Sequence, residues 1–252
     1  GGTFGDLWPT AQECREEILA AFPDNPVIQL PQSMHFESRD AFDRARAAVA
    51  RHRRLTLLWR DTASLETATR ELDAPSHLCP DMAFCLGPLK RLRSGTQPIV
   101  WLSRRDRERA IDPPAEAGGV TDWLDERHTA LRRANYALMG ATTRLTPRSL
   151  WHRLLMKTYV PLATQRLDRG IEKLSVAEVV ITDRLHGSVL AMLLQIPHVL
   201  VDNAHGKLSA FHDTWLRDVE GVRFARSAEE AVMMANGLLE GPSSPQRRDI
   251  AR

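Results

Sequence analysis

The sequence contains little cysteine and no long apolar run. Its three cysteines, Cys14, Cys79 and Cys85, form no CxxC pair and show no Cys/His spacing typical of a metal site. Neither a disulfide framework nor a zinc site is therefore expected. No apolar run approaches the length of a membrane span, and no signal peptide is visible at the start of the sequence. These absences favour a protein of the reducing cytoplasm.

An excess of charge of one sign is also missing. The 34 lysine and arginine residues nearly balance the 32 aspartate and glutamate residues, and the calculated pI is near 8.6. This balance gives no electrostatic indication of nucleic-acid binding, so nucleic acid is not expected as a partner. A hydrophobic content of 43% and a charged content of 26% are typical of a globular protein, and 252 residues suit one large domain or two smaller ones.

Segments typical of strands and helices alternate along the chain, which predicts an α/β fold built on parallel sheets. Apolar, β-branched runs predict strands at 27–31, 55–59, 98–102, 177–181, 199–201 and 223–225. Helical spacing of apolar residues predicts helices at 10–22, 39–52, 62–72, 120–139, 184–196 and 228–239. We interpret the basic stretch 89–96 as the linker between two domains, 1–92 and 97–240. The polar tail 241–252 is expected to be disordered.

The chain opens with GGTFGDLWP, a glycine-rich turn. Gly2 and Gly5 permit the backbone to approach a ligand closely. A loop of this kind normally follows a strand and precedes a helix. We therefore expect the first strand of the N-terminal domain to be missing from the sequence.

Polar side chains gather where the predicted strands end. They are Ser33, His35, Arg60, Asp61, Arg104, Thr182, Asp183, Arg184, His186, Asn203, His205 and Lys207. Because the carboxyl ends of parallel strands meet at one edge of a sheet, these side chains predict a polar cleft. The same residues could also be ordinary loop or surface residues, as Arg–Asp neighbours usually are.

The segment ITDRLHGSVLAMLLQIPHV, residues 181–199, combines a strand end with a helix start. Arg184 supplies a permanent cation, His186 an imidazole, and the helix N-terminus favours anions, so the segment is a candidate site for an acidic ligand. Thr182 or Asp183 could instead serve only as a helix cap.

Five segments, GGTFGD, QLPQSMHF, LLWRD, CPDMAF and ITDRLHG, follow one another in the order found in the polysaccharide pyruvyltransferase family, which the chain resembles. The resemblance implies two Rossmann-like domains facing a cleft, similar to GT-B glycosyltransferases. It also implies transfer of a pyruvyl group from phosphoenolpyruvate to a sugar as a cyclic ketal. No redox cofactor is expected, and no metal, because arginines can balance the phosphate charge. Thr3 departs from the family, where Asn is usual.

The resemblance also assigns residues to the two substrates. The N-terminal domain would hold the acceptor sugar through Gly2, Gly5, Asp6, Ser33 and His35. The donor phosphoenolpyruvate would bind to Arg60, Arg104, Arg184, Leu185, Asn203 and Lys207. Arginines from facing domains could grip its phosphate and carboxylate, and His186 could protonate the methylene carbon as general acid. Arg184 and His186 are thus the predicted catalytic pair.

Two alternatives stay open at this point. A GT-B glycosyltransferase with a nucleotide-sugar donor would share the fold and also bind an anionic donor. A non-catalytic module of a polysaccharide-synthesis complex is compatible with the departure at Thr3.

A further hypothesis concerns residues 147–169, which have a basic, amphipathic pattern with Trp151 and Tyr159. They could dock peripherally on the inner face of an anionic membrane, which would suit a lipid-linked oligosaccharide acceptor, or pack on the sheet with their charges in water. The sequence does not determine the oligomeric state.

Overall fold

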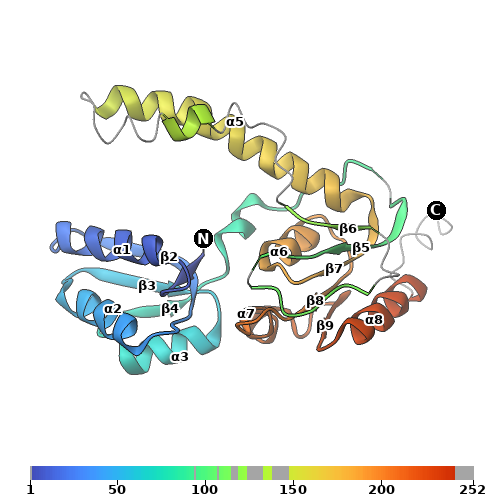
Figure 1. Ribbon diagram of the computed structural model, residues 1–252, viewed down its shortest axis with the longest axis horizontal. Helices are drawn as coiled ribbons and strands as arrows, with labels where there is room; N and C mark the ends of the chain where they lie inside the picture. The colour runs from blue at the N-terminus through green and yellow to red at the C-terminus, as the bar shows by residue number, and fades with distance from the viewer. Residues whose placement is uncertain are drawn as a thin grey trace.

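Two parallel sheets organise the chain. The computed structural model describes residues 2–93, 95–106, 108–114, 119–123, 133–137 and 148–241. One sheet has the strand order β1-β2-β3-β4 and the other the order β6-β5-β7-β8-β9 (Figure 1). All neighbouring strands run parallel. The predicted α/β fold with two Rossmann-like domains is confirmed.

The N-terminal sheet is covered by three helices, two of which begin at side-chain caps. Its elements are β1 (Thr3–Phe4), α1 (Pro9–Ala21), β2 (Val27–Met34), α2 (Arg39–Arg51), β3 (Leu55–Trp59), α3 (Thr62–Glu71), β4 (Ser76–Leu78) and the 3₁₀ helix η1 (Met82–Leu86). Ser38 and Asp61 cap α2 and α3, since each side chain accepts a backbone N–H of the first helical turn. Trp59, fully buried, anchors the core with Phe4 and Phe42.

Two strands at this edge differ from the prediction. Thr3–Phe4, expected to be only a turn, form a short strand in parallel register with Ser33 and Met34. Strand β2 also continues past Pro31, where it was expected to end, with a shift of register against β3 between Gln29 and Gln32. Proline has no N–H for the ladder, so the strand can continue only with such an irregularity. Ser33 lies beyond the last pairing with β3 and next to the last residue of β2.

The C-terminal sheet is buried on both faces. Its elements are β5 (Gln97–Leu102), β6 (Val120–Thr121), α5 (Arg148–Ser175), β7 (Ala177–Thr182), α6 (Leu185–Leu193), β8 (His198–Val201), α7 (Lys207–Phe211), the π-helical turn η2 (His212–Leu216), β9 (Val222–Ala225) and α8 (Ala228–Glu240). In β7, Val180 packs against α5 and α6, whereas Val179 and Ile181 pack against α8. The continuous apolar run Val179–Ile181 is what burial on both faces requires.

The helix predicted over 120–139 is wrong at its start. Val120 and Thr121 pair with β5 as the edge strand β6, and within the predicted range the described residues are helical only at 133–137. Two adjacent β-branched residues after Gly119, whose φ is +71°, favour a strand leaving a turn. Residues 124–132 and 138–147 lie outside the described chain, as does the predicted tail from 242 onward.

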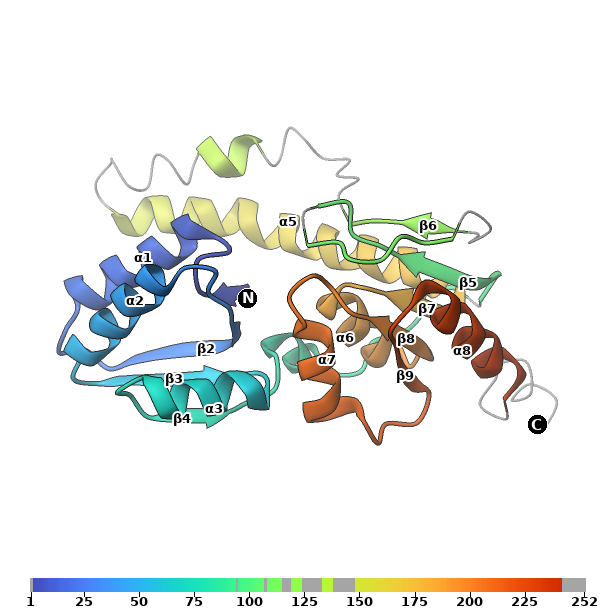
Figure 2. The ribbon, with the colours of Figure 1, turned by 60° about the horizontal axis from the view of Figure 1, so that its bottom comes forward.

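Helix α5 spans 28 residues and contains Pro161. Its C-terminal part packs on the second sheet through Ile171 and Leu174. Its N-terminal part leaves that sheet and extends over the first domain (Figures 1 and 2). Among the described residues no helix combines the length and apolar character needed to cross a membrane.

Candidate active site

Polar contacts join the two domains where their strands end. The Trp215 indole N–H donates to the carbonyl oxygen of Arg60 at 2.8 Å, and the Thr62 N–H donates to the Thr214 hydroxyl at 3.0 Å. The Lys207 Nζ donates to the Thr3 hydroxyl at 3.0 Å. The candidate site therefore lies between segments that are far apart in the sequence.

One buried network runs from the first domain to α6. Arg60, 4% exposed, donates from Nε to Ser33 Oγ at 2.8 Å and from a terminal nitrogen to Asp81 Oδ2 at 3.0 Å. The Nε2 atom of His186 lies 3.6 Å from the other oxygen of Asp81. Burial alone would raise the pKa of Asp81, but the nearby His186, the Ala83 N–H and the charge of Arg60 hold it well below its ordinary value. Asp81 thus stays ionised between the two predicted site residues.

A second network surrounds Arg184. This guanidinium lies 2.6 Å from the fully buried carboxylate of Asp122 and 4.0 Å from Asp106. Arg104 donates to Asp106 at 2.8 and 2.9 Å and contacts Glu108. The Nε of Arg184 is buried and has no hydrogen-bond acceptor among the described residues. One donor of Arg184 therefore remains available to an anion.

Lys207 connects the second network to the first domain. Its ammonium lies 2.6 Å from Glu108 and, as noted above, also reaches Thr3. Burial lowers the pKa of Lys207, although the charge of Glu108 opposes the effect. Thr3, the residue that departs from the family, thus has a defined partner across the domain interface.

Asp183 is the buried carboxylate that begins the turn into α6. Both of its oxygens accept the Arg104 backbone N–H, at 2.9 and 3.1 Å. Burial raises the pKa of Asp183 to about 6, although the same N–H, Arg184 and Arg104 all favour the ionised form. Asp183 therefore orients the strand end beside Arg184.

The predicted acceptor residues of the N-terminal loop support the segment after β2. A side chain at Gly5, where φ is +144°, would collide with the carbonyl oxygen of His35. The Asp6 carboxylate accepts the N–H groups of Glu37 and Ser38 at 2.8 and 2.9 Å. Gly2 is exposed and makes no such close approach. Gly5 and Asp6 thus position the backbone at His35. Direct contact of Gly2, Gly5 or Asp6 with a sugar stays a prediction.

Two predicted donor residues have structural partners. The Asn203 side-chain oxygen accepts the N–H groups of His205 at 3.2 Å and Lys207 at 3.3 Å, so it shapes the turn after β8. The side chain of Leu185 is buried in an apolar cluster with Val189 and Phe211. Contact of either residue with the donor remains a prediction.

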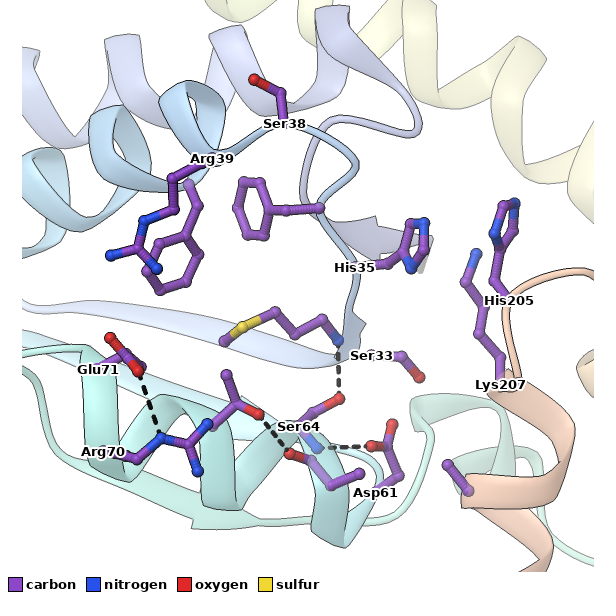
Figure 3. A pocket seen from close by; sticks show the side chains of 17 residues that line it. Ser33, His35, Ser38, Arg39, Asp61, Ser64, Arg70, Glu71, His205 and Lys207 are labelled. Atoms are coloured by element: carbon purple, nitrogen blue, oxygen red, sulfur yellow. Dashed lines mark hydrogen bonds and ion pairs between the residues drawn. The ribbon is translucent and has the colours of Figure 1, made fainter.

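A pocket of about 580 Å³ opens between the domains. Its walls include Arg39 and Arg70 at one end and His35, His205 and Lys207 at the other (Figure 3). Ser33, Asp61 and Ser64 form part of its floor. Hydroxyl, carboxylate and cationic groups in one cavity suit a ligand rich in hydroxyls or bearing negative charge.

The predicted site residues lie in three places, which are the pocket, the contacts around Asp81 and the network around Arg184. Ser33, His35 and Lys207 line the pocket, and Arg60 touches its wall through Ser33. His186 joins Arg60 only through Asp81, and Arg184 lies with Arg104 in the second network.

Three buried carboxylates of the site had no assigned role in the sequence: Asp81, Glu108 and Asp122. Only Asp81 lay in a quoted segment, CPDMAF, and there its side chain also caps η1 through the Ala83 N–H. Glu108 lies in a loop without periodic signal, and Asp122 lies in the segment 120–139 that the sequence predicts to be helical. Only the tertiary contacts reveal them.

Comparisons with known proteins agree on one family. Residues 1–205 match the model of polysaccharide pyruvyl transferases. Pyruvyl transferase 1 of Schizosaccharomyces pombe is 31% identical over 222 residues, which are 86% of this chain and 53% of that protein. The putative pyruvyl transferase EpsO of Bacillus subtilis is 30% identical over 240 residues, 91% of this chain and 72% of that protein. The chain thus spans about half the length of the first relative.

A solved structure shares the fold. The crystal structure of an uncharacterised protein from Klebsiella pneumoniae aligns with a TM-score of 0.55 at 16% sequence identity, over 90% of this chain and 74% of that one. At this identity the likeness concerns the fold alone.

Proposed function

The chain belongs to the family of polysaccharide pyruvyl transferases, and we propose that it transfers a pyruvyl group from phosphoenolpyruvate to a sugar of a polysaccharide or oligosaccharide precursor, releasing phosphate. The observation that carries the proposal is the network Ser33–Arg60–Asp81–His186, which spans both domains beside a polar pocket. It joins Arg60, an arginine predicted to bind the donor, to His186, a group able to transfer a proton.

The donor would bind where cations of the second domain converge. Phosphoenolpyruvate carries a phosphate and a carboxylate, and arginine binds both groups bidentately. Arg184 offers its buried Nε, while Arg104 and Lys207 are held nearby by Glu108. The carboxylates that pair with these cations keep them oriented before the ligand arrives.

His186 would act as general acid. Its side chain is about half exposed, at 53%, and faces Asp81. The enol methylene carbon would take the proton of His186, which makes the neighbouring carbon electrophilic. One sugar hydroxyl would add to that carbon and return its proton to His186. Phosphate would then leave with the C–O bonding electrons, and a second hydroxyl would close the ketal as its proton passes to the departing phosphate.

The acceptor would occupy the pocket between the domains. Ser33 and His35 line it, and its volume of about 580 Å³ falls within the usual range for small-molecule sites. The Ser33 hydroxyl and the His35 imidazole can donate hydrogen bonds to sugar hydroxyls or accept hydrogen bonds from them.

The decisive experiment measures phosphate release from phosphoenolpyruvate with a panel of glucosides, galactosides, mannosides and N-acetylmannosaminides. Wild-type protein should release phosphate with at least one acceptor, and His186→Ala should lose roughly a hundredfold or more in kcat while still binding phosphoenolpyruvate. His77→Ala, on the exposed strand β4, is the matched control and should retain activity. Normal turnover in His186→Ala would remove that residue from the mechanism.

Thermal stabilisation separates this proposal from its alternatives. A donor that binds the folded protein raises its melting temperature by mass action. Stabilisation by nucleotide sugars but not by phosphoenolpyruvate would favour a glycosyltransferase. Stabilisation by a sugar alone, with no phosphate release on any acceptor, would favour a binding module.

Arg184→Lys tests the donor-binding arginine. Lysine keeps the charge but loses the planar fork, so affinity for phosphoenolpyruvate should fall by tenfold or more. Arg217→Lys, at a side chain 67% exposed, should bind the donor normally.

The acceptor is further proposed to be lipid-linked and reached at the inner membrane face. The N-terminal half of α5 exposes Met156, Tyr159 and Val160 beside the exposed cations Arg153 and Lys157. The side chain of Trp151, central to the sequence hypothesis, lies outside the described residues. Binding to anionic liposomes at low salt should be lost on replacing Arg153 and Lys157 by Gln, and a wild-type protein that stays in the supernatant would contradict the idea.

A further inference from the structure

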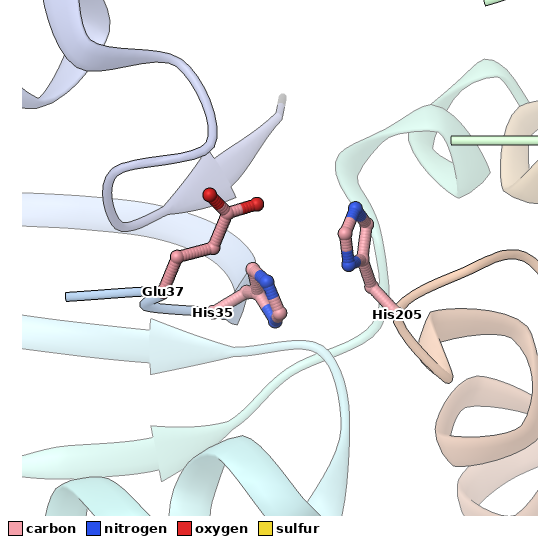
Figure 4. Close-up of side chains that lie close together, drawn as sticks. All are labelled: His35, Glu37 and His205. Atoms are coloured by element: carbon pink, nitrogen blue, oxygen red, sulfur yellow. The ribbon is translucent and has the colours of Figure 1, made fainter. Parts of the chain in front are cut away.

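Two histidines that line the pocket meet a nearby glutamate. His35 and Glu37 follow β2 in the first domain, and His205 follows β8 in the second (Figure 4). One potential ligand atom from each residue lies within 4.8 Å of the others. The two imidazole ring centroids are 4.3 Å apart. The docking of the domains alone creates this group.

The backbone around each of these side chains is held in place. The Asp6 carboxylate binds the Glu37 N–H, and the tight packing of Gly5 against the His35 carbonyl fixes the same loop. In the other domain the Asn203 side chain binds the His205 N–H. Supports of this kind are what a metal site requires to keep its ligands oriented.

A second observation also points to a ligand. The Nε2 atom of His35 is shielded from solvent and has no hydrogen-bond partner among the described residues. A buried ring nitrogen without a partner is unfavourable, and a bound cation would satisfy it. The neighbouring carboxylate of Glu37 is exposed and forms no ion pair within the described part of the chain, so it can turn toward the rings.

We propose that His35, Glu37 and His205 bind a divalent transition metal ion of the zinc type between the two domains. Two imidazole nitrogens and one carboxylate form a known three-ligand set for Zn²⁺, with a fourth position left open. Tetrahedral ligands of Zn²⁺ lie roughly 3.4 Å apart, given metal–ligand distances of about 2.0–2.2 Å. Closing from 4.8 Å therefore requires only small side-chain rotations. Ca²⁺ and Mg²⁺ prefer oxygen ligands and fit this set poorly.

The ion would connect the two domains beside the pocket, because its ligands come from both. His35 and His205 both line the pocket, so the open coordination position would face its interior. A water molecule or an oxygen atom of a pocket ligand could occupy that position. The inference does not depend on pyruvyl transfer, because metal binding can be measured without any turnover.

The test titrates the tag-free full chain with Zn²⁺ by calorimetry and with Co²⁺ by visible absorption. Wild type should bind one ion per chain with a tetrahedral Co²⁺ spectrum and a raised melting temperature. His35→Gln and His205→Gln should each weaken binding at least ~100-fold, because loss of an outer-shell partner alone costs about 10–100-fold. His77→Gln, an exposed histidine of β4, is the matched control and should bind as wild type.

Glu37→Gln provides a second test that remains valid if the histidine variants fail to fold. Glu37 is exposed, so its replacement should leave the metal-free melting temperature unchanged while weakening Zn²⁺ binding. No wild-type binding, or equal binding in wild type, His35→Gln, His205→Gln and Glu37→Gln, would overturn the proposal. Intact phosphate release with no Zn²⁺ binding would reject the metal site and leave the proposed function standing.

Discussion

At the residue scale, buried carboxylates determine how the cations of the site are oriented. Asp81, Glu108 and Asp122 are at most 4% exposed, and each lies against an arginine or lysine of the site. A buried charge without a partner is strongly unfavourable, so each carboxylate restricts the position of its cation.

Asp81→Asn should lower the free energy of unfolding by ~3 kcal/mol, because Arg60 would stay charged and buried without an ionised partner. Chemical denaturation measures the change. The matched control is Asp213→Asn on the surface, where the side chain is 58% exposed and pairs with Arg217. That control should change stability by less than ~0.5 kcal/mol. Equal losses in both variants would show that the Arg60–Asp81 pair contributes little.

Asp183→Asn should alter the pH dependence of stability. Burial raises the folded-state pKa of Asp183 to about 6, so the proton binds more tightly to the folded chain than to the unfolded chain. The stability that the folded chain gains from protonated Asp183 is complete below the ordinary pKa near 3.8. It is lost as the pH rises through about 6. Relative to wild type, the Asn variant should gain at most about 3 kcal/mol between pH 4 and pH 7.

Urea unfolding of both proteins at several pH values provides the measurement for Asp183. A difference that grows from pH 4 to pH 7 is the expected result. Parallel stability curves over that interval would contradict the raised pKa.

At the element scale, strand β1 and the segment after β2 support each other. The His35 N–H donates to the Phe4 carbonyl at 2.9 Å, and Gly5 follows directly with a positive φ. Next to them Asp6 binds the loop that carries Glu37. A two-residue strand thus fixes one wall of the pocket.

Gly5→Ala should therefore destabilise the protein by ~2 kcal/mol or more, because alanine both disfavours this φ and collides with the His35 carbonyl. Gly237→Ala is the contrasting control. Gly237 lies within α8 with open space around its Cα, so alanine there should stabilise by ~0.5–1 kcal/mol. Thermal unfolding should separate the two variants in opposite directions, and a neutral Gly5→Ala would show that the loop relaxes.

At the scale of the whole molecule, the site exists only when the domains dock. Trp215 and Thr214 of η2 hold the start of α3, and Lys207 reaches Thr3. Removing one such contact should loosen the domain arrangement without disturbing either core.

Trp215→Phe removes the indole N–H donated to the Arg60 carbonyl while keeping an aromatic ring. It should cost ~1 kcal/mol of stability, the usual net value of one hydrogen bond. Amide hydrogen exchange should also rise at Thr62, whose N–H bonds to Thr214 in the same contact. Unchanged exchange at Thr62 would show that the interface does not depend on Trp215. Trp8→Phe, at an indole 46% exposed, serves as the control.

The sequence by itself indicated most of the strands and helices and the family. Helix caps at Ser38 and Asp61 and the apolar runs around Val180 are local signals, so alternation of strands and helices could be predicted without knowledge of the fold. The strand-end rule also indicated the edge at which Ser33 and Lys207 meet.

Only the tertiary structure decided which of those strand-end residues touch. Asp81 between Arg60 and His186, Glu108 beside Lys207 and the approach of His35 to His205 all depend on long-range packing. The edge strand at Val120 and the continuation of β2 beyond Pro31 depend on pairing with neighbouring strands as well. Periodicity reports which face of an element is buried, but side-chain partners follow from how two separately formed sheets dock.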